Sequence, residues 1–76
     1  MNLEECRKEI DSIDKELVAL FVKRMNVAKE VAEYKKETGK AIYDAERERQ
    51  LLEKVEDAAG EEFGDYTRRL YSSILE

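Results

Sequence analysis

The feature that most constrains the fold is a row of apolar residues that recurs in alternating steps of three and four between Leu3 and Tyr34. The row consists of Leu3, Cys6, Ile10, Ile13, Leu17, Leu20, Val27, Val31 and Tyr34. This spacing places side chains along one side of a single long α-helix. One position of the row, Arg24, carries a guanidinium instead. A charge in an apolar row is costly unless an anion meets it, so Arg24 is the first candidate for a binding residue.

Glycines and one aspartate divide the 76-residue chain, which contains no proline, into three helical segments. Gly39 predicts the end of a long first helix, and Asp44 is a good N-cap for a second. Gly60 and Gly64 bracket a turn before a short third helix. The predicted helices span about residues 3–38, 44–59 and 65–76. We therefore predict a single all-α domain over residues 1–76.

The long helix carries more apolar surface than the two short helices can cover. A second apolar row lies beside the first and consists of Val18, Phe21, Met25, Ala28 and Ala32. The middle of this helix must therefore be covered on more than one side. A chain of this length buries little surface alone. We predict a homodimer in which two long helices pair and the shorter helices pack over them.

Composition excludes several classes of function. A net charge of −5 argues against nucleic-acid binding, and no apolar run approaches the ~20 residues of a membrane span. A single cysteine, Cys6, suits a reducing, cytoplasmic setting and is expected to be a small core residue. The chain has no histidine, so it lacks the usual general base and metal ligand. We expect no metal and no cofactor, and any enzymatic chemistry should need little proton transfer.

Several charged residues share faces with apolar ones. Lys35 follows Arg24 by eleven residues, which places the two cations within ~20° of one face and about 16 Å apart along the axis. On the second helix, Glu48 points the same way as the apolar stripe Leu51, Leu52, Val55, Ala58 and Ala59, with Arg47 next to it and Asp44 one turn earlier. Two cations and a carboxylate on such faces suggest a polar pocket inside a helical bundle.

Each of these residues also has a purely structural interpretation. Arg24 could form an intersubunit salt bridge or set the register of the helices, and Lys35 could be a solvated cation at a helix end. Glu48 could simply pair with either cation. Arg7 lies ~25 Å from Arg24 along the axis and is rotated by ~100°. It cannot reach the same ligand within one chain, but it could reach the ligand of the partner in an antiparallel dimer.

In four stretches the sequence resembles the all-helical class of chorismate mutase. The stretches are residues 7–14 (RKEIDSID), 20–24 (LFVKR), 27–35 (VAKEVAEYK) and 44–49 (DAERER), with a looser match at 66–71 (YTRRLY). Each motif is weak alone, but their order and spacing together are specific. The resemblance implies an intertwined homodimer of three-helix chains with two equivalent active sites and a small dicarboxylate substrate, chorismate.

The resemblance also implies a role for each candidate site residue. Arg24 is expected to bind one substrate carboxylate, and Arg7 another from the partner subunit. Lys35 is expected to contact the ether oxygen of the breaking bond. Asp44 and Glu48 are expected to hold the ring hydroxyl, which makes Lys35 and Glu48 the candidate catalytic residues. Arg47 matches a recurrent position of the family.

Other interpretations stay open on the sequence alone. The leading one is a mutase domain from the N-terminal part of a two-domain enzyme of aromatic amino acid biosynthesis. Isochorismate pyruvate lyase shares the fold, and a non-catalytic dimerisation or regulatory module is a third interpretation. In the family the third helix continues beyond the position of Glu76 and supplies further polar contacts. The expectation is therefore a truncated third helix, and a weak mutase in the 76-residue form.

Overall fold

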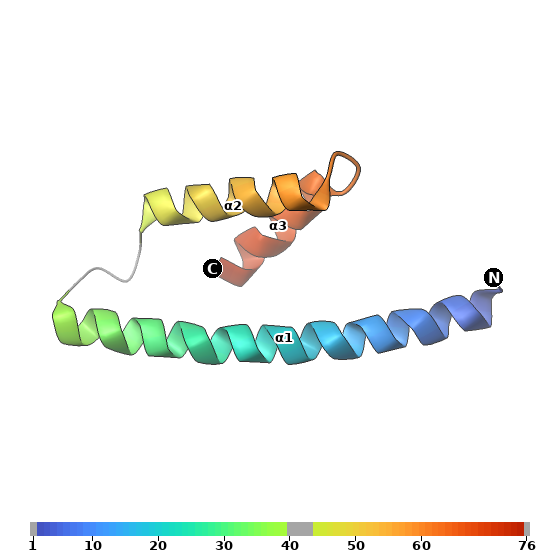
Figure 1. The fold of residues 1–76 in the computed structure, drawn as a ribbon, viewed down its shortest axis with the longest axis horizontal. Coiled ribbons are helices and arrows are strands. Elements are labelled where there is room, and N and C mark those ends of the chain that lie inside the picture. The colour runs from blue at the N-terminus through green and yellow to red at the C-terminus, as the bar shows by residue number, and fades with distance from the viewer. Residues whose placement is uncertain (1, 40–43, 76) are drawn as a thin grey trace. The chain divides into compact units, whose positions relative to one another are not determined.

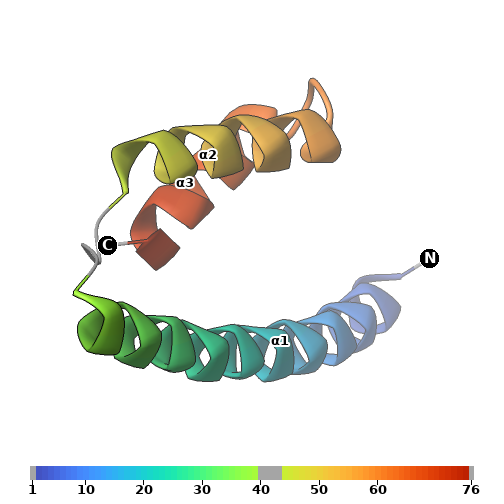
Figure 2. The same ribbon diagram turned by 60° about the vertical axis from the view of Figure 1, so that its left-hand side comes forward.

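The computed structural model describes residues 2–39 and 44–75 and contains three α-helices there, with no strand in either range. This confirms the predicted all-α class with one long helix and two short ones. The chain divides into two compact units, Met1–Ile42 and Tyr43–Glu76, and each is described by itself (Figures 1 and 2).

The first unit contains α1, which spans Leu3–Thr38. Its N-cap is Asn2, whose side-chain oxygen accepts a hydrogen bond from the Glu5 N–H at 2.8 Å. The helix ends at Gly39, where φ is 74° and the backbone N–H donates to the Lys35 carbonyl. A left-handed residue is strained with a β-carbon, so glycine fits this position and ends the helix as predicted.

Apart from the half-buried Cys6, the apolar side chains of the row on α1 are exposed. Exposed fractions reach 65% at Leu3 and 63% at Leu20, and Val31, near the other end, is still 47% exposed. No apolar side chain in the described residues is fully buried. The longest apolar surface of α1 is therefore exposed. Nowhere in residues 2–39 or 44–75 does a helix combine the length and the apolar character that crossing a membrane requires.

The second unit is a hairpin of α2, Ala45–Ala59, and α3, Gly64–Leu75. Asp44 caps α2, as predicted, because its Oδ1 accepts a hydrogen bond from the Arg47 N–H at 3.1 Å. Gly60 and Gly64 bracket the turn at residues 61–63, as predicted, and Gly64 is the first residue of α3. The Phe63 carbonyl accepts hydrogen bonds from both the N–H and the hydroxyl of Thr67, at 2.9 and 2.8 Å. The predicted end of this helix at Glu76 lies outside the described residues.

The two helices of the hairpin pack against each other, and α3 lies beside α2 in both views (Figures 1 and 2). Half-buried apolar side chains occur on both helices: Leu51, Leu52, Val55 and Ala59 of α2, and Tyr71, Ile74 and Leu75 of α3. Ala58, expected on the same stripe, is exposed.

A close approach of the two backbones fixes one end of the contact. Gly64 is buried, and a β-carbon placed on it would lie 3.1 Å from both Cγ and the carbonyl oxygen of Glu56. The same glutamate accepts a hydrogen bond at 2.8 Å from Nη1 of Arg68, one turn further along α3. The absent side chain of Gly64 therefore allows α3 to start directly against α2.

Candidate functional site

The two cations predicted for the site stand out on α1. Four of its 36 residues are half-buried, namely Cys6, Arg24, Ala32 and Lys35, and the others are exposed. At 100° per residue, Arg24 and Lys35 lie within ~20° of each other around the axis. Long cationic side chains are usually among the most exposed of all. The structure therefore places Arg24 and Lys35 together on one partly covered face of α1.

Glu48 stands out on α2 in a different way. It is half-buried and continues the stripe of Leu51 and Leu52. Its carboxylate has no hydrogen bond or ion pair within the described part of the chain. Glu56, the other half-buried carboxylate of the helix, is paired with Arg68 at 2.8 Å. A partly covered carboxylate without a donor loses hydration and gains nothing in return, so Glu48 is suited to accept a hydrogen bond from a ligand.

Two further predicted residues lie near Glu48 along the chain. Asp44 serves as the N-cap, and one carboxylate oxygen, Oδ1, is engaged by the Arg47 N–H. The Arg47 side chain is exposed. Asp44 precedes Glu48 by four residues, about one helical turn. The cap role of Asp44 leaves its second oxygen, Oδ2, for another partner.

The remaining candidate, Arg7, is exposed on the first third of α1. The first unit thus carries Arg7, Arg24 and Lys35, and the second carries Asp44, Arg47 and Glu48. That these two groups meet at one ligand stays a prediction.

Other charged residues of α2 form a surface network. The Arg49 guanidinium contacts Glu46 at 2.6 Å and Glu53 at 2.8 Å, and all three side chains are more than half exposed. The hydrogen bond from Arg49 lowers the pKa of the Glu46 carboxyl below its ordinary value. Hydrogen bonding to Glu46 likewise raises the pKa of Arg49. Such i, i+3 and i, i+4 pairs stabilise a helix, and Glu48 is not a member of this network.

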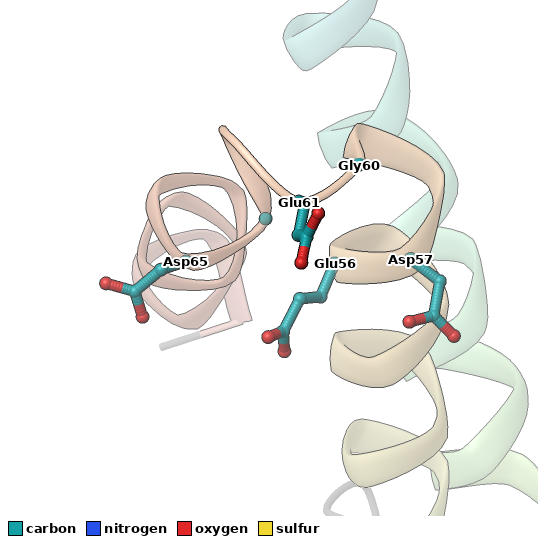
Figure 3. Close-up of a pocket in the computed structure, with 6 residues that line it drawn as sticks. Glu56, Asp57, Gly60, Glu61 and Asp65 are labelled. Atoms are coloured by element: carbon teal, nitrogen blue, oxygen red, sulfur yellow. The ribbon is translucent and has the colours of Figure 1, made fainter.

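An acidic pocket lies at the corner of the hairpin (Figure 3). Its walls come from the end of α2 and the start of α3 and include four carboxylates: Glu56, Asp57, Glu61 and Asp65. In Figure 3 the Asp57 and Asp65 side chains point away from each other on opposite sides of the pocket. Across the described residues, no three acidic or cysteine side chains come together as a metal site would require.

The Glu56–Arg68 pair and the close approach of Gly64 were not anticipated from the sequence. The two charged residues are twelve positions apart on different helices, so no periodicity relates them. The only sequence signal was Gly64 itself, which also fits a turn. This contact holds the hairpin that carries Asp44 and Glu48.

The first unit is a long helix with two partly covered cations, Arg24 and Lys35, and the second is a capped helical hairpin with a partly covered carboxylate, Glu48. Comparison with known proteins makes the class definite. The family model described as chorismate mutase type II matches residues 6–76. The chain belongs to this family.

Curated relatives agree with this assignment. The chain is 42% identical over 53 residues to a chorismate mutase of Methanocaldococcus jannaschii, a match that covers 70% of this chain and 54% of that protein. It is 43% identical over 53 residues to a bifunctional chorismate mutase/prephenate dehydratase of Aquifex aeolicus, covering 70% of this chain and 15% of that protein. A T-protein of Haemophilus influenzae is 43% identical over 51 residues, covering 67% and 14% respectively.

The chain thus matches about half of one relative and about one seventh of the other two. No solved structure matches the chain with significance.

Proposed function

We propose that this chain catalyses the rearrangement of chorismate to prephenate, a step of aromatic amino acid biosynthesis. The observation that carries the proposal is the match of the chorismate mutase type II family over residues 6–76. The partly covered cations Arg24 and Lys35 and the available carboxylate of Glu48 support it, because they suit a dicarboxylate with a hydroxyl group.

The reaction suits a chain without histidine. The rearrangement is unimolecular and needs neither a nucleophile nor a proton shuttle. It requires that the dianion be held in its reactive chair conformation, which cationic clamps on two carboxylates can impose. It also requires positive charge beside the ether oxygen, where negative charge develops as the bond breaks.

Each candidate residue has a part in this mechanism. Arg24 holds one carboxylate of the substrate from the middle of α1. Lys35, on the same face, places its ammonium beside the ether oxygen. Asp44 and Glu48 accept hydrogen bonds from the ring hydroxyl, and Arg47 lies next to them on α2. Because the catalytic contribution is electrostatic, the charge of each group matters more than its acid strength.

The working form in this proposal is a homodimer. The exposed row of α1, from Leu3 to Tyr34, is an apolar seam of the kind that pairs two long helices. Arg7 lies too far along α1 from Arg24 to share a ligand with it in one chain. In an antiparallel pair of α1 helices, Arg7 of one chain reaches the site of the other and clamps the second carboxylate.

Product identification tests the activity. Purified chain is incubated with chorismate, and the products are separated and identified by mass spectrometry and NMR. Formation of prephenate above the uncatalysed rate supports the proposal. Release of pyruvate from isochorismate, or tight chorismate binding without turnover, contradicts it and points to a lyase or a regulatory module.

Subunit mixing tests the dimer and the role of Arg7 separately. Arg7→Ala and Arg24→Ala are purified as two weakly active proteins and then mixed in equal amounts to exchange subunits. A heterodimer has one site with both defects and one intact site, so about a quarter of wild-type activity should return. If both variants are dimers that exchange subunits and no activity returns, Arg7 does not act across the interface. This result would leave the proposed mutase activity of the wild type untouched.

A further inference from the structure

We draw no further inference here: the strongest candidate, the acidic pocket between the end of α2 and the start of α3, is a cluster of carboxylates in which Glu56 is already paired with Arg68, and nothing else in the described residues points to a ligand there.

Discussion

Replacing Glu48 with glutamine should separate activity from stability. The substitution keeps the shape of the side chain and removes its charge. Because the Glu48 carboxylate has no hydrogen bond or ion pair in the described residues, no partner is left unpaired by the change. The free energy of unfolding should therefore change by less than about 0.5 kcal/mol, as for a substitution away from any special contact.

The effect on catalysis should be much larger. Loss of one charge-assisted hydrogen bond that strengthens in the transition state costs about 2–4 kcal/mol, which corresponds to a decrease of roughly 30- to 900-fold in kcat/KM. The assay follows chorismate loss by ultraviolet absorbance, together with urea unfolding monitored by circular dichroism. Both measurements use the same protein preparation, so activity and stability can be compared directly.

Glu53→Gln is the matched control. It makes the same chemical change five residues further along α2, in a carboxylate that contacts Arg49 at 2.8 Å and is 55% exposed. This variant should keep wild-type kcat/KM, since exposed pairs of this kind contribute little. Equal kcat/KM values for the Glu48→Gln and Glu53→Gln variants would refute the assignment of Glu48. The assignment would also be refuted if the Glu48→Gln variant lost activity only because it was less stable.

Three further outcomes follow from the hairpin and the helix ends. Gly64→Ala should destabilise the protein by about 1 kcal/mol in urea unfolding, because the new β-carbon meets the Glu56 backbone at 3.1 Å; unchanged stability would mean that α3 shifts freely. Gly39→Ala should lower the free energy of unfolding by about 1–2 kcal/mol, because alanine is strained at a φ of 74°; the added carbon itself meets nothing within 4 Å. A Gly39→Ala variant as stable as the wild type would contradict the left-handed conformation of this residue. The hydrogen bond from Arg49 lowers the pKa of Glu46 in the folded state. The pair therefore stabilises the folded protein at pH values above 4.5, the ordinary pKa, and this contribution is lost as the pH falls through the lowered pKa of the folded state. The stability difference between wild type and Arg49→Met should accordingly shrink as the pH falls below 4.5, and a constant difference would argue against this pair.

The sequence predicted most of the helical structure because local signals agree there. The apolar spacing, the glycine at position 39 and the aspartate at position 44 each have one dominant structural meaning, and the structure confirms the last two as caps. Gly64 follows the turn, as predicted, but the sequence did not reveal its second role. A glycine can bound a turn and can also let two helices approach closely, and Gly64 does both.

The site was predictable only as a set of residues. Arg24 was identified because its charge interrupts an apolar row, and Lys35 because its spacing places it on the same helical face as Arg24. The partial burial of both residues on α1 agrees with that reasoning. Their relation to Glu48 depends on how separate helices and, in the proposed dimer, two chains pack together. Such packing arises from many weak contacts between residues far apart in sequence, which no local periodicity encodes.

The most direct test of the central claim is the rate of prephenate formation by Arg24→Leu relative to the wild type. Leucine restores the apolar row of α1 and removes the proposed clamp for the substrate carboxylate. We predict that kcat/KM falls by about 10²-fold or more while the protein stays folded and dimeric. A folded Arg24→Leu dimer that forms prephenate at the wild-type rate would show that this arginine sets the register of the helices and does not bind the substrate.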